Sequence, residues 1–481
     1  MSTPNTDPAQ EATDLSAQSV PENARMSRTG LTMAWWSLCS AMFSVIVGPS
    51  LALRYGTRNA IVGMLLAVVA FSVVNGVFAR YAIRTGNSVA LASRVVFGTL
   101  AAPVATLIFA ATNIYYAVFE SSVVAVAIHH MVPSLPYAVA ALIVVGYSAP
   151  LVFGSVQHWL DKLNGVLLPF YLLGLLAAVV MATRAYGYSD AWLNFGPAEA
   201  APTYGWVQCF AFYLGSAAYM MATFDFARFG RPRDVRYHGL FNFGVPFWLM
   251  TFVVNGVVGI YLVATIPANG PLSEISVVFA LLGLMGIWGF GFLWVTQTRI
   301  NTASYYLATL NVHGCFAGLL LRVMKRPLPR FVWVLLIGVL VYVLMLADVF
   351  SHLLSALAYQ GVFIAAWAGV MFATLIGSGV SREASRQPST LHRAAVLAWL
   401  LSTLIGLAMM HGAFGNADDV RHFAAPATFA AAFVLHFLLR SRVAAGAARP
   451  QGSSRRREAR FAATRPWQQV SAAGTQRAVK P

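Results

Sequence analysis

The chain has 481 residues, of which 58% are hydrophobic and only 10% are charged. Soluble proteins average roughly 45–50% apolar and about 25% charged residues. This composition excludes a single water-soluble domain and indicates one polytopic membrane body. The three cysteines, Cys39, Cys209 and Cys315, lie singly in apolar or amphipathic stretches, without the paired spacing of a disulfide framework or a zinc site.

The net charge of +16 is concentrated at one end of the chain. Between Arg440 and Pro481 there are ten Lys or Arg residues and one acid, Glu458, which is +9 of the total. Residues 441–481 are predicted to be a basic, disordered cytoplasmic tail, and residues 1–30 a disordered cytoplasmic N-terminus. A basic tail beside an anionic leaflet favours contact with lipid, and we expect no nucleic acid partner.

Apolar runs of about 17 to 25 residues, which cross a hydrocarbon core, predict twelve transmembrane helices. We place them at 31–53, 58–80, 97–131, 137–154, 163–185, 205–224, 238–266, 276–310, 330–347, 351–377, 392–411 and 423–440. The third and eighth are longer than a bilayer requires, so they either tilt or partly leave it.

The distribution of positive charge predicts the orientation, because short cytoplasmic loops retain Lys and Arg. Loops after even-numbered helices are the basic ones, and the loop after the sixth carries Arg228, Arg231, Arg233 and Arg236. The loops after odd-numbered helices carry few Lys or Arg residues. This pattern places both termini in the cytoplasm of a multi-pass plasma (inner) membrane protein.

Two predicted helices contain features that interrupt an apolar span. The first has Ser40, Ser44 and a Gly48-Pro49 pair, and the proline frees carbonyls near residues 44–46, which can coordinate a small cation or mark a packing kink. The sixth has Gly215, Ser216 and two alanines. Interrupted helices five apart indicate an inverted-repeat transporter, although small-residue helix packing is the alternative.

The third predicted helix clusters polar and aromatic side chains around Glu120, with Tyr115 and Tyr116 one turn before it. A carboxyl group in hydrocarbon must be protonated, paired or bound to a cation, so Glu120 is either functional or part of a structural ion pair. The two tyrosines can stack on a flat ring or serve only in packing.

The eighth predicted helix carries Thr296, Gln297, Arg299 and Asn301, which is too polar for a lipid-facing surface. The amides of Gln297 and Asn301 lie one helical turn apart, and each offers a donor and an acceptor, which suits an amide-like heterocycle. Thr296 offers a hydroxyl oxygen to a cation. Arg299 needs a carboxylate partner, and Glu120 is the candidate.

These residues resemble the nucleobase:cation symporter-1 family, which includes purine and cytosine permeases and a hydantoin transporter. The likeness covers residues 30–380 and rests on Asp225-Phe-Ala-Arg228-Phe229 and on Thr296-Gln297 followed by Asn301. The resemblance implies an all-α membrane fold of two inverted five-helix repeats, about 31–185 and 205–377, like that of leucine transporters. The repeats form a core over 31–377, and two further helices lie within 392–440.

The resemblance also implies the site. A planar substrate would lie between Tyr115 or Tyr116 and an aromatic of helix six, with Gln297 and Asn301 reading its edge. The family's helix-six aromatic position falls on Gly215 or Ser216 here, so Tyr219 would take its place. The cation site would lie near Phe43 to Ile46 and on Thr296. Glu120 stands where or beside where relatives carry an amide, which makes a proton as plausible a coupling ion as sodium.

We therefore expect a secondary active importer of a nucleobase-like heterocycle, such as cytosine, a purine, uracil, allantoin or a hydantoin, with no cofactor besides the coupling ion. A channel, or a transporter of an unrelated small organic solute on the same fold, is the alternative. We expect no enzyme, although Glu120 with His129, His130 or His158 is the arrangement that one would use. The sequence does not indicate an oligomeric state.

Overall fold

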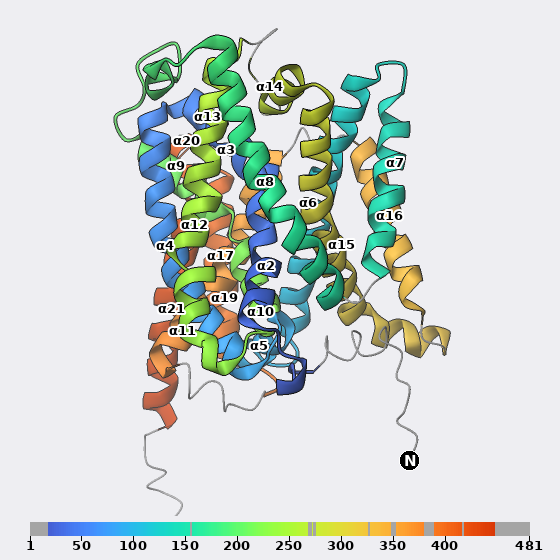
Figure 1. Cartoon of the computed structure of the whole chain (residues 1–481). Coiled ribbons are helices and arrows are strands. Elements are labelled where there is room, and N and C mark those ends of the chain that lie inside the picture. The colour runs from blue at the N-terminus through green and yellow to red at the C-terminus, as the bar shows by residue number, and fades with distance from the viewer. Residues whose placement is uncertain are drawn as a thin grey trace, which may run out of the picture.

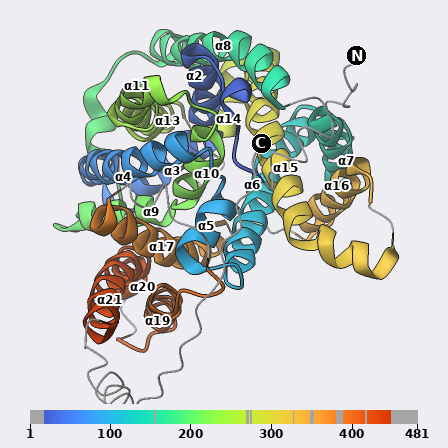
Figure 2. The ribbon, with the colours of Figure 1, turned by 90° about the horizontal axis from the view of Figure 1, so that it is seen from below.

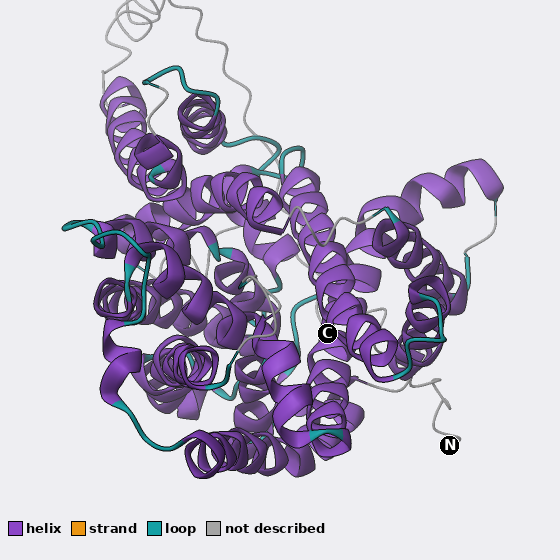
Figure 3. Ribbon diagram, turned by 90° about the horizontal axis from the view of Figure 1, so that it is seen from above, coloured by secondary structure: helices purple, strands orange, loops and turns teal. Residues whose placement is uncertain are grey.

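The computed structural model describes residues 18–153, 156–267, 272, 276–325, 328–347, 353–379, 389–415 and 418–447. Throughout these residues the chain is helical and has no strand (Figure 3). The main helices are α2 (Arg28–Trp36), α3 (Met42–Tyr55), α4 (Thr57–Thr85), α5 (Val89–Phe97), α6 (Ala102–Met131), α7 (Tyr137–Ser148), α8 (Val156–Tyr186), α9 (Gly205–Gly215), α10 (Ala218–Ala227), α13 (Asn255–Thr265), α14 (Ser276–Met285), α15 (Ile287–Met324), α16 (Arg330–Leu346), α17 (Leu353–Ser378), α19 (Arg393–Met410) and α21 (Ala424–Ala447).

The sixth predicted span is broken where its small residues stand. Helices α9 and α10 meet at Ser216 and Ala217 with a bend of 43°. The first predicted span is broken as well, between the short helix η2 (Ser37–Ser40) and α3, with a bend of 40°. Both interruptions were predicted, but the one in the first span stands at a different residue from the one expected.

The break in the first span lies at Ala41, whose backbone is extended at ψ 127°, and not at Gly48-Pro49. Helix α3 continues through Pro49. The proline deprives the Val45 carbonyl of its helical partner, and that oxygen faces Gly259 of α13 so closely that a Cβ there would lie 2.0 Å from it. Pro49 is therefore accommodated by close helix packing, and the freed carbonyl is directed at α13.

The two long predicted spans differ from the structure in where their helices begin. The third, expected from residue 97, begins at Ala102, because Gly98 at φ +94° ends α5 and turns the chain. The eighth, expected over 276–310, is divided at Gly286, which has φ +53° and separates α14 from α15. A positive φ is accessible to glycine at little cost, so single glycines can change direction here.

Six helices among the described residues are long and apolar enough to span a membrane, or eight if each bent pair counts as one span. Four shorter apolar helices lie within Tyr137–Val152, Ser276–Met285, Arg330–Leu346 and Ala424–Arg440. The chain is thus a multi-pass membrane protein. The count of twelve spans and the inverted repeat stay predictions.

The helices form two groups that meet along α6 and α15. A separate apolar cluster joins α6, α7, α15 and α16, while the main core joins α2, α3, α4, α9, α10 and α13. Figure 2 shows α7 and α16 beside α15 at one edge and α19 and α21 beside α17 at another. Helices α6 and α15, which pack along each other over much of their length, lie between the two groups (Figure 1).

Residues 18–27, which we name the N-terminal strap, cross the end of the molecule where α5 and α10 lie. Val20 N–H donates to the Gly86 carbonyl at 2.9 Å, and Met26 N–H donates to the Phe229 carbonyl at 2.8 Å. Arg25 donates to the carbonyls of Ile83 and Gly230. The prediction of disorder over 1–30 is therefore wrong for residues 18–30, because these backbone groups are bonded to the helix ends.

The remaining boundary predictions concern the tails. Helix α21 extends to Ala447, so disorder from residue 441 is wrong for residues 441–447. Residues 1–17 and 448–481 lie outside the described residues.

Candidate functional site

A buried cavity lies where the two broken spans meet α6 and α15; we name it the central cavity. Its wall is formed by Leu38, Ala41, Phe43, Phe109, Asn113, Tyr116, Glu120, Ala218, Tyr219, Ala222, Ile300, Ala303, Ser304 and Leu307. The centre of a water molecule can occupy about 50 Å³ of it. That is space for a few waters, so a ligand bound here must be compact or must widen the cavity.

Two helices begin at this cavity because of the breaks. Helix α3 starts at Met42 and α10 at Ala218, and the wall includes Ala41 and Phe43 at the first start and Ala218 and Tyr219 at the second. A helix N-terminus presents unpaired N–H groups and the positive end of the helix dipole. The Met42 N–H donates to Gln297 Oε1 at 3.3 Å. The cavity therefore favours partial negative charge, such as carbonyl oxygens.

Glu120 is the acid on the wall of the central cavity. Its side chain is 1% exposed and lies beside the Gln297 amide. Neither carboxyl oxygen has a hydrogen bond of regular geometry within the part of the chain that the structure describes. A buried, unsatisfied carboxyl group is costly, and in a native site it points to a proton, an ion or a ligand that completes it.

Further buried polar atoms near Glu120 lack a hydrogen bond among the described residues. They are Tyr116 Oη, Gln297 Nε2 and Gln360 Nε2. Gln360 comes from α17 and lies beside the Tyr116 hydroxyl. Since Gln297 Oε1 accepts from Met42, its amide nitrogen is the end left for another acceptor.

Aromatic rings supply much of the remaining surface. Phe43 meets Tyr116 edge to face with ring centroids 6.2 Å apart, and it meets Phe119 in the same way at 6.1 Å. Across the cavity, Tyr219 packs on Trp248 at 5.4 Å. Rings from α3, α6 and α10 with polar groups between them suit a flat, nitrogen-containing ligand.

Several predicted site residues lie away from this wall. Asn301 donates to Ser121 Oγ at 2.8 Å and to Ser148 Oγ at 3.3 Å, so its amide joins α15 to α6 and α7. Tyr115 lies behind Tyr116, with ring centroids 6.4 Å apart. The structure brings together Tyr116, Tyr219, Glu120 and Gln297 of the predicted set, and it gives Asn301 an interhelical role.

Gly215 and Ser216 line a second, larger hollow of about 410 Å³, which we name the outer hollow. Arg54, Tyr55 and His422 also line it, and Tyr55 Oη lies 3.2 Å from His422 Nε2. The outer hollow is bounded toward the central cavity by the sixth-span break and by α17, where Gly361 approaches the Gly215 carbonyl. Gly215 and Ser216, the residues predicted for the helix-six position, therefore line the outer hollow and not the central cavity.

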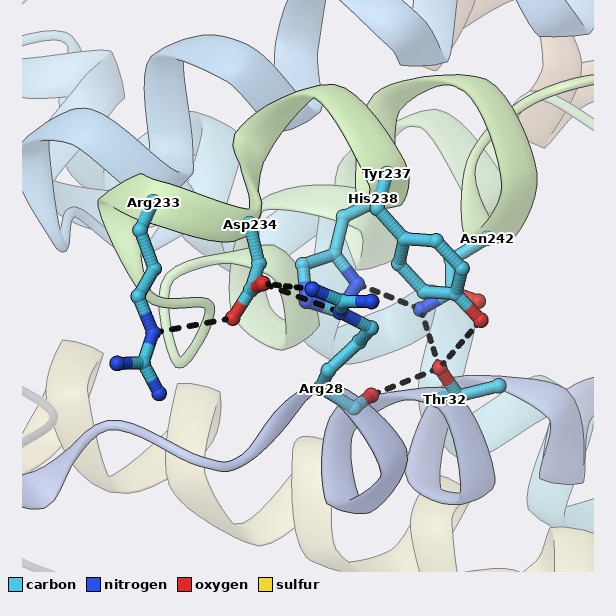
Figure 4. A network of polar contacts seen from close by, with 7 residues as sticks. All are labelled: Arg28, Thr32, Arg233, Asp234, Tyr237, His238 and Asn242. Carbon is cyan, nitrogen blue, oxygen red and sulfur yellow. Dashed lines mark hydrogen bonds and ion pairs between the residues drawn. The ribbon is translucent and has the colours of Figure 1, made fainter.

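At the N-terminal end of α2, polar side chains join this helix to the segment that follows α10. Arg28 Nη2 donates to Asp234 Oδ1 at 2.9 Å, and Arg233 lies 3.7 Å from the other oxygen (Figure 4). Thr32 accepts from Asn242 Nδ2 at 3.1 Å. We name Arg28, Asp234, Thr32 and Asn242 the inner latch.

The motif Asp225-Phe-Ala-Arg228-Phe229 closes α10 at this same end. Asp225 Oδ1 accepts from the Val89 N–H at the start of α5 at 3.1 Å, and Arg228 Nε donates to the Asp225 carbonyl at 3.2 Å. The Phe229 carbonyl accepts a hydrogen bond from the Met26 N–H of the N-terminal strap. The motif thus fixes the end of α10 to α5 and to the N-terminal strap.

No family model matches the chain, and no curated protein matches it in sequence. Several solved structures match it in fold. Mhp1, described as a nucleobase-cation-symport-1 family transporter in a closed conformation with bromovinylhydantoin bound, superposes with a TM-score of 0.69 at 14% identity, over 90% of this chain and 96% of that one. The chain has the fold of Mhp1.

Other solved structures agree with this result. The inward-facing conformation of Mhp1 superposes with a TM-score of 0.68 at 13% identity, over 89% of this chain and 94% of that one. A point mutant of the manganese transporter from Eremococcus coleocola gives a TM-score of 0.53 at 15% identity, over 88% of this chain and 98% of that one. The identities are low, so these likenesses establish the fold alone.

Two of the predicted cation residues make hydrogen bonds within their own helices. The Phe43 ring lines the central cavity, and the Ile46 carbonyl accepts from the Ser50 hydroxyl at 2.9 Å. Thr296 Oγ1 donates to the Phe292 carbonyl at 2.9 Å. The cation site near Phe43 to Ile46 and on Thr296 stays a prediction, and the break in the first span lies at Ala41, just before these residues.

Glu120 was one possible partner for Arg299, but the groups that act electrostatically on Arg299 are different ones. Arg299 is buried on another side of α15, where its electrostatic neighbours are Cys39 and Tyr171. Tyr171 Oη donates to Asn255 Oδ1 at 2.7 Å, and Asn255 Nδ2 donates to the Cys39 carbonyl at 2.6 Å, so Arg299 belongs to a polar cluster joining η2, α8, α13 and α15.

Gln360 is the residue near the cavity that the sequence reasoning missed. It stands in the mostly apolar predicted helix 351–377 and is the one amide in that stretch. A single amide in such a run is the same kind of signal that identified Glu120, and it was available in the sequence.

Proposed function

We propose that the protein is a secondary active transporter that imports a nucleobase-like heterocycle by cation symport. The observation that carries this proposal is the central cavity, where two broken spans meet α6 and α15 around unsatisfied polar atoms of Glu120 and Gln297. Broken helices at corresponding positions of two halves are typical of substrate sites in transporters with inverted repeats.

The chemistry of the wall supports the substrate class. Tyr116, Tyr219 and Phe43 offer ring surfaces, and Glu120 offers hydrogen bonds, with the Gln297 amide beside it. A small, flat, nitrogen-containing ring satisfies both at once. The hydantoin in the Mhp1 structure is a ligand of this kind on the same fold.

The two closures around the cavity support alternating access. On one side the sixth-span break and α17 stand between the cavity and the outer hollow. On the other side the inner latch holds α2 to the segment at Asp234. We propose that the two helix groups rock against each other along α6 and α15, so that one closure opens while the other holds.

The membrane orientation is part of the proposal. We infer that the strap, the inner latch and both termini face the cytoplasm, because the adjoining loops carry Arg84, Arg94, Arg228, Arg231 and Arg233. The outer hollow then opens to the exterior. The inverted repeat over about 31–185 and 205–377, with two trailing helices, belongs to the same proposal.

A metal ion is the substrate that the manganese transporter likeness would suggest. The central cavity does not favour it, because its wall has one carboxyl group, one amide (Asn113) and one hydroxyl (Ser304) among phenyl, phenol and aliphatic side chains. Manganese prefers several carboxylate, carbonyl or water oxygens. An organic ring matches this wall better.

Uptake into proteoliposomes tests the function directly. Radiolabelled cytosine, uracil, hypoxanthine, allantoin and hydantoin are offered in turn under a proton gradient, a sodium gradient, or neither. We expect saturable accumulation of at least one ring compound that depends on one of the gradients. Ion current without substrate coupling would instead show a channel, and uptake of none of the five would refute the heterocycle assignment.

A further inference from the structure

We propose that Glu120 binds substrate as the neutral acid, so that the coupling proton and the substrate's hydrogen-bonding edge occupy the same site. The inference rests on the proposed function and deepens it. It also names the recognised edge: one N–H donor beside one acceptor, as in a lactam or an amidine.

The geometry gives the first step. Both Glu120 oxygens are buried on the cavity wall without a hydrogen bond of regular geometry among the described residues. The Gln297 side chain lies beside the carboxyl group, and its Nε2 likewise lacks a regular hydrogen bond. A neutral carboxyl group presents one donor and one acceptor side by side, which matches a lactam edge with two hydrogen bonds. An ionised carboxylate presents two acceptors, and these repel the carbonyl of the same ligand.

Charge gives the second step. Within the described residues, no Lys, Arg or His side chain lines the central cavity. An ionised Glu120 would therefore need positive charge from the ligand or from a metal ion. The beginnings of α3 and α10 disfavour a cationic ligand or a metal ion, because their positive ends meet at the cavity.

The surroundings of Glu120 contain few groups that titrate near neutrality. Tyr116 on α6 and Tyr219 on α10 interact with it electrostatically, and α15 and α17 contribute the amides Gln297 and Gln360. Cys39 of η2 interacts with Tyr219 and with Arg299 of α15. Asp225 of α10 interacts with Arg228 and the α5 backbone at the inner end. Glu120 is thus the group whose protonation changes the edge offered to a ligand.

Coupling follows from sharing the site. A proton on Glu120 creates the donor that the substrate carbonyl needs, and the bound substrate accepts from that proton and so stabilises it. Each ligand raises the affinity of the other by the same factor. The substrate's own bonds stay intact: the proton arrives from one side and forms an O–H bond on the carboxyl group, and that O–H bond breaks when the proton leaves with the substrate on the other side.

The test uses the full chain in proteoliposomes and the ring compound among cytosine, uracil, hypoxanthine, allantoin and hydantoin that the wild type accumulates. We compare wild type with Glu120→Gln, whose amide keeps one acceptor and supplies a permanent donor. Wild-type affinity is expected to fall about tenfold per pH unit above the titration of Glu120 and to be flat below it. Glu120→Gln is expected to bind substrate independently of pH and to lose proton-driven accumulation.

A second measurement is independent of any variant. In weakly buffered solution above the titration point, substrate binding to purified wild type should take up one proton per molecule bound, and the N-methyl derivative lacking the edge N–H should neither bind nor take up a proton. Affinity that rises with pH would overturn the inference in favour of a ligand with two adjacent donors. Proton-driven accumulation by Glu120→Gln would overturn it while leaving the transport function in place. If wild type accumulates none of the five compounds, both proposals fail.

Discussion

Gly361 of α17 lies against the carbonyl oxygen of Gly215 at the end of α9, and a Cβ on Gly361 would stand only 2.8 Å from that oxygen. The neighbour is backbone, so it cannot rotate aside. This contact brings α17 onto the sixth-span break, between the outer hollow and the central cavity.

Gly361→Ala should therefore displace α17 from the break and impair the outer closure. Overpacking of this kind costs about 1–3 kcal/mol, and we expect uptake to fall roughly tenfold or more. Gly377→Ala on the same helix is the matched control, because its Cβ would meet only the Arg440 side chain at 3.7 Å. Equal uptake by the two variants would remove this contact from the transport cycle.

At the inner latch, Arg28 and Arg233 both form an ion pair with Asp234, so the effects of removing each arginine can be compared. Arg28 lies 2.9 Å from Asp234 and Arg233 lies 3.7 Å from it, with Arg233 the more exposed side chain. Partly exposed pairs contribute up to about 1 kcal/mol, so Arg28→Gln should raise thiol labelling of a cysteine placed at Ala222 from the strap side by up to about fivefold. Arg233→Gln should leave labelling unchanged, and the reverse order would contradict the latch.

Asn301 should behave as a structural residue. Its amide bonds Ser121 and Ser148, and interhelical hydrogen bonds in membrane proteins contribute about 0.6 to 1.7 kcal/mol. We expect Asn301→Ala to lower the melting temperature in detergent while substrate affinity changes by less than about threefold. Thr309→Ala is the control, since that hydroxyl bonds its own helix at Tyr305. Lost binding with an unchanged melting temperature would return Asn301 to the substrate site.

Pro49 should be dispensable for the break. Helix α3 already runs through it, and the neighbouring carbonyl of Val45 is accommodated by Gly259. Replacement by alanine restores a helical hydrogen bond, so uptake by Pro49→Ala should stay within about twofold of wild type and stability should not fall. A loss of uptake beyond about tenfold would show that transport needs Pro49 in addition to the break at Ala41.

The sixth-span break lies at the small residues where the sequence predicted it, because a row of small side chains stands out in an apolar helix. The sequence misplaced the first break, since a proline in a membrane helix is tolerated when a glycine on the facing helix leaves room for the freed carbonyl. That room depends on α13, which lies far along the chain from α3, and no local pattern reports it.

Glu120 and Gln297 were identified by the cost of polar groups in hydrocarbon, and the structure brings them together. Asn301 was selected by the same argument, but the α15 residues on the cavity wall are Ile300, Ala303, Ser304 and Leu307. Each residue turns a helix by about 100°, so one position decides whether an amide faces the cavity or a neighbouring helix. The rotation of α15 is set by packing against α6, which the sequence alone does not reveal.

The N-terminal strap has a consequence for biosynthesis. Met26 and Arg25 bind Phe229 and Gly230, and the last of these is made 205 residues after Arg25. The strap therefore cannot reach its final position until the sixth span has been inserted. Closing so large a loop is slow and entropically costly, which makes the strap one of the last elements to dock during assembly.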